Sequence, residues 1–247
     1  MLSADRHVSL ITINRAEARN ALNTSLLNEL LAAFRAANKD KNCRVILLSG
    51  EGTDAFCSGA DLKEISSGSA KQRSEFFRSL QTLLAEMIKG DKPIVAKVHG
   101  YALAGGMGLV AASDVVLASR EAIFALPEIK VGLAALTILP ILTSTLRDKE
   151  LSHLLYTGDR LNAEEALRLG FVSRIFEKDA LDREALHLAL TLSERNFDAV
   201  IAIKRSVFEC TKKHTLKMLP RGAREAIKLL KKKNTLSAIN SFLENMQ

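Results

Sequence analysis

The sequence contains no tryptophan, only two tyrosines and only three cysteines in 247 residues. The cysteines, Cys43, Cys57 and Cys210, are too few and too scattered for a disulfide framework or a cysteine-based zinc site. No stretch approaches the roughly 18 consecutive apolar residues of a membrane-spanning helix, and no basic and then apolar leader begins the chain. These absences predict reduced thiols, a cytoplasmic location and no membrane partner.

Several catalytic and binding motifs are also missing. The five histidines show no metal-ligand spacing such as H-E-x-x-H, so we predict no metal site. No G-x-S-x-G segment is present, which disfavours a serine nucleophile. The glycines near residue 105 do not give the G-x-G-x-x-G spacing of a dinucleotide site.

The net charge of +7 is concentrated late in the chain. This pattern favours a solvated helical face, and the alternative is attraction of an anion such as a nucleotide phosphate or RNA. Only Phe208 lies among these basic residues, so no aromatic platform for RNA is predicted. The residues are Lys204, Arg205, Lys212, Lys213, Lys217, Arg221, Arg224, Lys228 and Lys231 to Lys233.

Hydrophobic periodicity predicts a mixed α/β protein with one main domain. Strand patterns cover residues 8–13, 45–49, 94–98 and 115–118. Helix patterns begin at Asn23 or Thr24, cover 72–88 and begin again near Met107. A capping-box pattern at residues 162–165 predicts a short helix ending at Gly170. From about residue 180 the pattern is helical only, over residues 181–195, 199–213, 217–233 and 236–245, with Pro220 and Gly222 as expected breaks.

Residues 101–108, with the sequence YALAGGMG, are the most informative segment. They follow the apolar run 94–98 and predict a strand, a tight glycine turn and the start of a helix. Glycines at a helix start let a substrate oxygen approach bare backbone N–H groups, where the helix dipole favours negative charge. Glu128, which follows Pro127, is the candidate proton carrier. A close-packed strand-to-helix turn gives the same pattern, so this segment alone does not distinguish an oxyanion site from a structural turn.

A second small-residue loop occupies residues 55–64, with the sequence AFCSGADLKE. It follows the predicted strand at 45–50 and should open toward the same edge of the sheet. Two loops with exposed N–H groups at one edge predict a pocket for an oxyanion.

With residues 14–15, 20–22, 155–166 and 170–172, these segments resemble the enoyl-CoA hydratase/isomerase (crotonase) superfamily over nearly the whole chain. The resemblance implies an α/β crotonase-type spiral of ββα units. It implies an acyl-CoA-binding core over residues 1–190 and a helical tail over 191–247. Through this tail, members form a homotrimer or a dimer of trimers.

The resemblance also implies a site. The N–H groups of Ala60 and Gly105 would hold the thioester oxygen, and Glu128 would move the proton. Asp61, Leu62 and Lys63 would line the path of the adenine and pantetheine groups. Coenzyme A is then part of the substrate, and no further cofactor is implied.

Two departures from the family pattern bear on the reaction. Gly108 stands where two-acid hydratases carry a glutamate, and residues 134–137 (AALT) replace a glycine-rich turn. One carboxylate suffices to move a proton from C2 to C4, so we predict Δ3,Δ2-enoyl-CoA isomerisation. Hydration of a 2-enoyl-CoA, including methylglutaconyl-CoA hydratase-like activity, is the alternative. A nonenzymatic RNA-binding protein is the alternative from another class.

Overall fold

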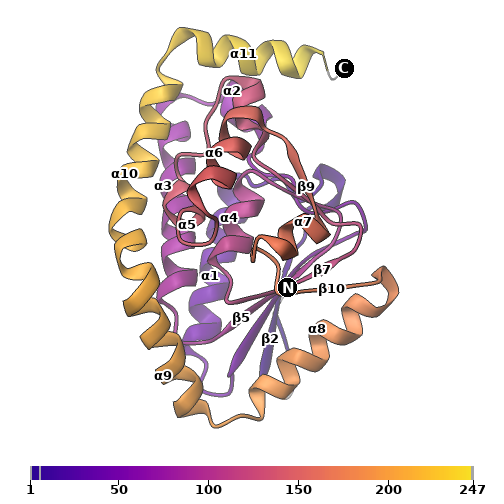
Figure 1. Ribbon diagram of the computed structural model, residues 1–247. Helices are drawn as coiled ribbons and strands as arrows, with labels where there is room; N and C mark the ends of the chain where they lie inside the picture. The colour runs from indigo at the N-terminus through magenta and orange to yellow at the C-terminus, as the bar shows by residue number, and fades with distance from the viewer. Residues whose placement is uncertain (1, 6, 246–247) are drawn as a thin grey trace.

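The computed structural model describes residues 2–5 and 7–245. Its strands form two sheets (Figure 1). The larger sheet has the order β1 (Leu2–Asp5), β2 (Val8–Ile13), β3 (Val45–Gly50), β5 (Ile94–Val98), β7 (Val115–Ser119), β10 (Arg174–Phe176). The smaller sheet has the order β4 (Ala55–Cys57), β6 (Tyr101–Leu103), β8 (Ile123–Ala125), β9 (Arg160–Asn162). Among the strands of the described residues, only the β1–β2 and β8–β9 pairs are antiparallel.

Three consecutive strand pairs repeat one pattern. β3, β5 and β7 lie in the larger sheet, and each is followed directly by β4, β6 or β8 in the smaller sheet. A helix comes next in each unit: α2 (Leu62–Ser67) with α3 (Ala70–Lys89), α4 (Gly105–Ala112), and the 3-10 helix η2 (Pro127–Val131). This arrangement confirms the predicted spiral of ββα units. Because β4 and β6 pair in parallel, the loops that follow them lie at the same edge.

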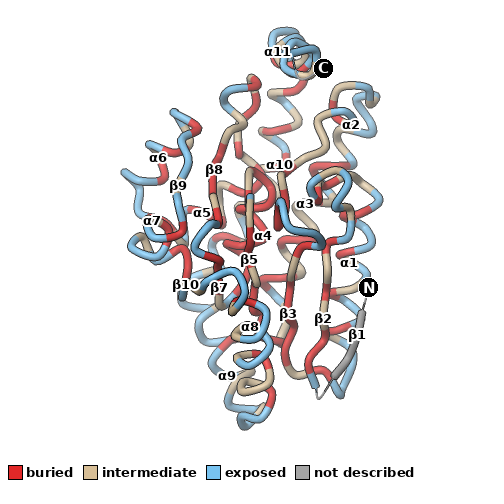
Figure 2. The backbone as a smooth tube through the Cα atoms, turned by 90° about the vertical axis from the view of Figure 1, so that its right-hand side faces the viewer, coloured by how far each residue is buried: buried red, intermediate tan, exposed pale blue. Residues whose placement is uncertain are grey.

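Alternating side chains of the central strands divide the core into two clusters. Val45 and Leu47 pack with α8 (Lys178–Ser193), whereas Ile46 and Leu48 belong to the larger cluster with α1 (Thr24–Lys39) and α3. This follows from the two-residue period of a strand, and Figure 2 shows these inner strands as the buried part of the molecule. Asn23 caps α1 by accepting a hydrogen bond from Leu26 N at 2.8 Å, as predicted.

Further short helices precede the C-terminal region in the chain. They are η1 (Ala16–Ala18), α5 (Leu139–Leu142), α6 (Asp148–Thr157) and α7 (Ala163–Arg168). Asn162 and Glu165 form the predicted capping box of α7. The three cysteines are free: Cys43 and Cys57 are buried and Cys210 is exposed. Over the described ranges, no helix is long and apolar enough to cross a membrane.

The C-terminal region is helical, as predicted, but its helices differ from the expected ones. α9 (Phe197–Val207), a π-helical turn η3 (Phe208–Lys212) and α10 (Lys213–Leu230) follow without a break, and α11 (Lys233–Glu244) crosses the top of the molecule (Figure 1). The expected breaks at Pro220 and Gly222 are wrong, because α10 continues through both. A Cβ at Gly222 would lie 2.2 Å from the carbonyl oxygen of Leu136, so this glycine permits close packing rather than ending the helix. The predicted domain boundary at residue 190 falls inside α8 and stays a prediction.

Candidate active site

The two predicted loops meet at the start of α4. Gly59 has a φ of +93°, and a Cβ there would lie 2.6 Å from the Ala104 Cβ and 3.5 Å from the Gly105 nitrogen. Only glycine tolerates both this conformation and this contact. α4 begins at Gly105, two residues earlier than expected, so the Gly105 N–H is the first of the unpaired N–H groups of that helix.

The Ala60 loop is held from its other side by Leu22. Leu22 N donates to Gly59 O at 2.7 Å, and Asp61 N donates to Leu22 O at 2.8 Å. This parallel bridge directs the Ala60 N–H away from Leu22. Asn20 fixes the same region, since its Nδ2 donates to the carbonyl oxygens of Glu51 and Ala55.

The N–H groups of Ala60 and Gly105 are both free to bind a ligand. Neither one donates to an acceptor among the described residues. Ala104, which precedes Gly105, has φ +51° and ψ −119°, a backbone conformation that residues other than glycine rarely adopt. Strain of this kind is often found where a backbone group is aimed at a ligand.

Glu128 lies on η2, which Gly132 ends in a left-handed conformation. Leu133 N donates to Glu128 O at 2.9 Å and fixes this turn. The side-chain Oε2 is fully buried and has no hydrogen-bond partner among the described residues. Burial raises the pKa of Glu128 to about 7, so the carboxyl can exchange protons near neutral pH.

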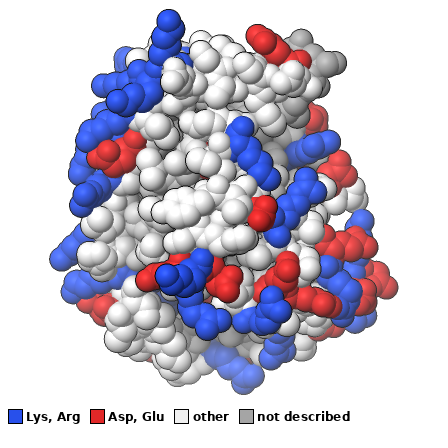
Figure 3. Space-filling view, turned by 45° about the horizontal axis from the view of Figure 1, so that its top comes forward, with Lys and Arg blue, Asp and Glu red and all other residues white. Residues whose placement is uncertain are grey.

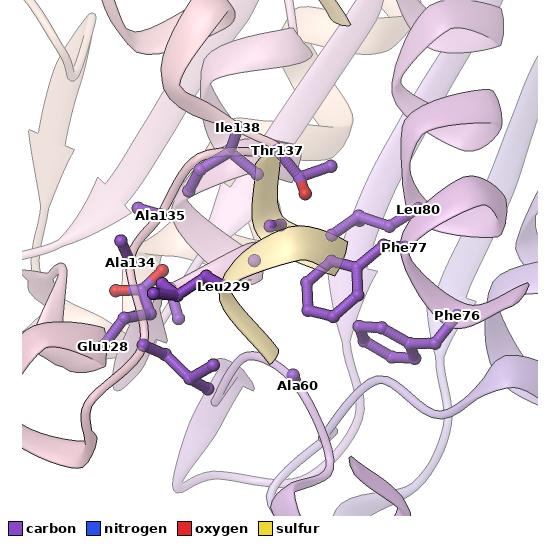
Figure 4. A pocket seen from close by; sticks show the side chains of 14 residues that line it. Ala60, Phe76, Phe77, Leu80, Glu128, Ala134, Ala135, Thr137, Ile138 and Leu229 are labelled. Atoms are coloured by element: carbon purple, nitrogen blue, oxygen red, sulfur yellow. The ribbon is translucent and has the colours of Figure 1, made fainter. Parts of the chain in front are cut away.

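One cavity of about 40 Å³ joins these groups. Ala60, Gly105 and Glu128 all line it. Figure 4 shows Phe76, Phe77 and Leu80 of α3 on the side opposite Glu128. Ala104, Leu133, Ala134, Ala135, Thr137, Ile138, Ala226 and Leu229 complete the lining.

No second carboxylate lines this cavity within the described residues. At Gly108, a Cβ would lie only 2.5 Å from Ile138 Cγ2 and 3.0 Å from Ile138 Cβ. Ile138 therefore fills the space that a glutamate at position 108 would need. Cys57 is no alternative acid, because burial raises its pKa to about 12.

The three residues after Ala60 do not line the cavity. The Asp61 carboxylate caps α2 by accepting hydrogen bonds from Lys63 N and Glu64 N, and it pairs with Arg15 at 2.7 Å. Leu62 is half-buried and Lys63 is exposed at the start of α2. Their contacts with adenine and pantetheine stay a prediction.

The sequence reasoning missed the residues that complete the cavity from a distance. Ala226 and Leu229 come from α10, more than 90 residues after Glu128, and no local pattern indicates such a contact. Thr137 was visible only as part of the departure at residues 134–137. Its hydroxyl is buried and unpaired like the Glu128 Oε2.

A spiral α/β core with two free N–H groups beside a buried carboxyl is the arrangement expected of an enzyme that stabilises an oxyanion. The family model described as enoyl-CoA hydratase/isomerase matches residues 3–247, and this chain belongs to that family. This family lies within the crotonase superfamily, whose members bind acyl-CoA substrates.

Relatives in this family have different activities. The chain is 33% identical over 212 residues to the mitochondrial Δ(3,5)-Δ(2,4)-dienoyl-CoA isomerase of Rattus norvegicus, covering 80% of this chain and 64% of the relative. It is 36% identical over 181 residues to the (E)-benzylidenesuccinyl-CoA hydratase of Thauera aromatica, covering 73% and 70%. The crystal structure of an enoyl-CoA hydratase from Bacillus halodurans superposes with a TM-score of 0.90 at 25% identity, covering 98% of both chains.

Proposed function

We propose that the protein is a Δ3,Δ2-enoyl-CoA isomerase in which Glu128 is the only proton carrier. The Glu128 carboxylate removes a proton from C2 of a 3-enoyl-CoA, and the electron pair moves to the thioester oxygen. Glu128 then returns the proton to C4, which leaves the double bond between C2 and C3. The substrate and product have the same composition, so no water or redox partner is required.

The N–H groups of Ala60 and Gly105 stabilise the dienolate oxygen in this mechanism. Charge on that oxygen develops only as the C2 proton leaves, so preorganised donors lower the barrier rather than merely bind substrate. One such donor contributes about 3 kcal/mol to the barrier in comparable sites.

The observation that carries the proposal is the lone carboxyl in the cavity. Ile138 occupies the space beside Gly108, and Glu128 has an apolar environment that keeps its pKa near 7. A single carboxyl that titrates near neutral pH is suited to accepting a proton and returning it.

Hydration of a 2-enoyl-CoA is the second candidate, because the Thauera relative at 36% identity is a hydratase. Glu128 would then activate water for addition to the double bond.

We also propose a homotrimer or dimer of trimers, which the exposed Ile203 and Val207 of α9 support. Sedimentation velocity would measure the mass of the assembly.

A direct test offers the purified protein a 3-enoyl-CoA and a 2-enoyl-CoA of the same chain length in parallel. We expect double-bond migration in the first and little water addition in the second. Glu128→Gln should lower turnover by several orders of magnitude while acyl-CoA binding persists. Glu121→Gln makes the same change at an exposed site and serves as the control. Brisk hydration of the 2-enoyl-CoA with no migration in the 3-enoyl-CoA would contradict the proposal.

A further inference from the structure

We infer that Thr137 is a specificity-determining residue. Its hydroxyl binds a neutral oxygen on the acyl chain of the substrate, either a hydroxyl or a keto group. The inference rests on the proposed function in one respect, namely that the cavity holds the acyl group. It adds a substrate class: acyl-CoA thioesters with an oxygen function along the chain rather than plain hydrocarbon chains.

The hydroxyl of Thr137 has no hydrogen-bond partner among the described residues, whereas most buried hydroxyls in proteins have one. Thr137 is 3% exposed, and its Oγ1 makes no hydrogen bond with any described residue. Leaving such a group unpaired is unfavourable, and a hydrogen bond to a ligand oxygen would offset that cost. The residue lines the same cavity as Glu128.

Other threonines show how a hydroxyl that binds no ligand usually satisfies its hydrogen-bonding capacity. Thr82, Thr143, Thr157 and Thr211 each donate to a backbone carbonyl three or four residues earlier. This local bond satisfies the hydroxyl without any ligand. Thr137 makes no such bond, so its hydroxyl remains available to a molecule in the cavity.

The rest of the lining fixes the chemistry of the ligand. The thioester oxygen is assigned to Ala60 and Gly105, and Glu128 is assigned to the proton. All other lining side chains are apolar, and no lysine or arginine lines the cavity in the described part of the chain. A carboxylate or ammonium group there would be buried without a counter-charge, which is strongly unfavourable. A neutral oxygen can accept from or donate to the threonine hydroxyl.

The position of Thr137 indicates which part of the ligand it meets. Figure 4 shows Thr137 beside Ile138, on another side of the cavity from Glu128. Its segment is fixed on both sides: Leu139 N donates to Ala135 O at 2.9 Å, and α10 packs against Leu136 O through Gly222. The hydroxyl is therefore presented by a rigid backbone to an atom of the acyl chain that Glu128 does not reach.

The test measures binding of saturated ligands, which the enzyme cannot isomerise or hydrate. The probes are hexanoyl-CoA and its 4-oxo, 5-oxo and 6-hydroxy derivatives, titrated calorimetrically into the full chain. We expect at least one oxygenated ligand to bind about tenfold more tightly than hexanoyl-CoA. Thr137→Val, which replaces the hydroxyl by a methyl group, should reduce that preference by about three- to tenfold. Thr137→Ser should retain it, and so should Thr143→Val, the same change at an exposed site.

Two results would overturn the inference: no oxygenated ligand binds more tightly than hexanoyl-CoA, or Thr137→Val keeps the wild-type preference. Both results leave the proposed function intact, since hexanoyl-CoA still binds. Failure of hexanoyl-CoA and all its derivatives to bind would instead overturn the proposed function and this inference with it.

Discussion

At the scale of single residues, Glu128 is held in a form that favours reactivity over stability. Its pKa is raised from 4.5 to about 7 by burial, so the ionised base lacks solvation. Ionisation provides the base that the isomerisation needs, and it also weakens the fold. Activity and stability should therefore respond to pH in opposite directions.

We expect kcat/KM to rise with pH through an apparent pKa near 7, because the ionised Glu128 takes the C2 proton. Between about pH 4.5 and 7 the folded protein binds more protons than the unfolded chain, so its free energy of unfolding falls as pH rises. Denaturant titrations of wild type and Glu128→Gln at pH 5 and pH 8 measure this, and the variant should lose less stability. An activity profile that is flat from pH 5 to 8 would contradict the prediction.

Gly108 and Ile138 are predicted to be energetically coupled. Gly108→Ala should cost about 1–3 kcal/mol in the free energy of unfolding, because the new Cβ overlaps Ile138 Cγ2. In an Ile138→Ala background, which removes that methyl, the same substitution should cost less. A double-mutant cycle in urea gives the coupling, and strictly additive effects would show that Ile138 does not fill this space.

The parts of the candidate site that the sequence indicates are those built from local chemistry. Glycine turns and the Pro-Glu step have signatures within a few residues, and Ala60, Gly105 and Glu128 do line one cavity. Ile138 beside Gly108 and the unpaired hydroxyl of Thr137 depend on distances of a few ångströms between separate segments. Hydrophobic periodicity carries no information on such distances between separate segments.

At the scale of elements, α10 closes the cavity with its inner face. Ala226 and Leu229 line the cavity, and α10 also packs against α3 and α5. Pro220 and Gly222 have low helix propensity, so the sequence predicts a break, and tertiary packing overrides that propensity. The structure places Gly222 where another backbone approaches, so packing accounts for this glycine.

Gly222→Ala is expected to displace α10 from residues 136–137. The added Cβ would lie 2.2 Å from Leu136 O, a backbone atom that cannot move aside cheaply. In a free helix the substitution would be favourable by about 0.5–1 kcal/mol. Here we expect lower stability and a higher KM, measured by urea unfolding and steady-state kinetics. Stabilisation with unchanged KM would show that α10 is not packed this closely in solution.

A partly buried ion pair attaches α9 to the larger sheet. Lys204 Nζ lies 2.7 Å from Asp114 Oδ2 and donates to Lys92 O at 2.6 Å. Asp114 also accepts from Ile94 N, so the pair joins the helix to the start of β5. Burial lowers the pKa of Lys204, which Asp114 partly counteracts. Such a pair is weak as a source of stability but costly to break on one side.

Lys204→Met should therefore cost about 2–4 kcal/mol, because Asp114 loses the nearer of its two cations and keeps only Lys212 at 3.6 Å. The matched control is Lys213→Met. Lys213 pairs with Glu209 on an exposed helix face, where a cost below about 0.5 kcal/mol is expected. Equal costs for the two variants in urea unfolding would contradict the role assigned to Lys204.

At the scale of the whole molecule, a row of positive charge lies on the outer face of α10, the helix that closes the site. Lys217, Arg221, Arg224 and Lys228 are exposed on α10, and Figure 3 shows a blue edge along that side. These positions are three or four residues apart and so share one face, whereas Ala226 and Leu229 face the cavity. The arrangement fits the solvated helical face that the sequence favours over an RNA surface.

Reversing this charge is accordingly expected to have a small effect on substrate binding. Arg221→Glu with Arg224→Glu should weaken acyl-CoA binding by less than about threefold, since both side chains point away from the cavity. Affinity should fall only gradually with salt, as expected when few phosphate charges are involved. An RNA-binding surface behaves differently, because each neutralised phosphate releases counterions and the affinity falls steeply with salt. Two measurements distinguish a solvated face from an RNA-binding surface. They are fluorescence anisotropy with labelled RNA at 50 and 200 mM salt, and calorimetry with an acyl-CoA. Tight RNA binding that this double substitution abolishes would reverse the assignment of the basic face.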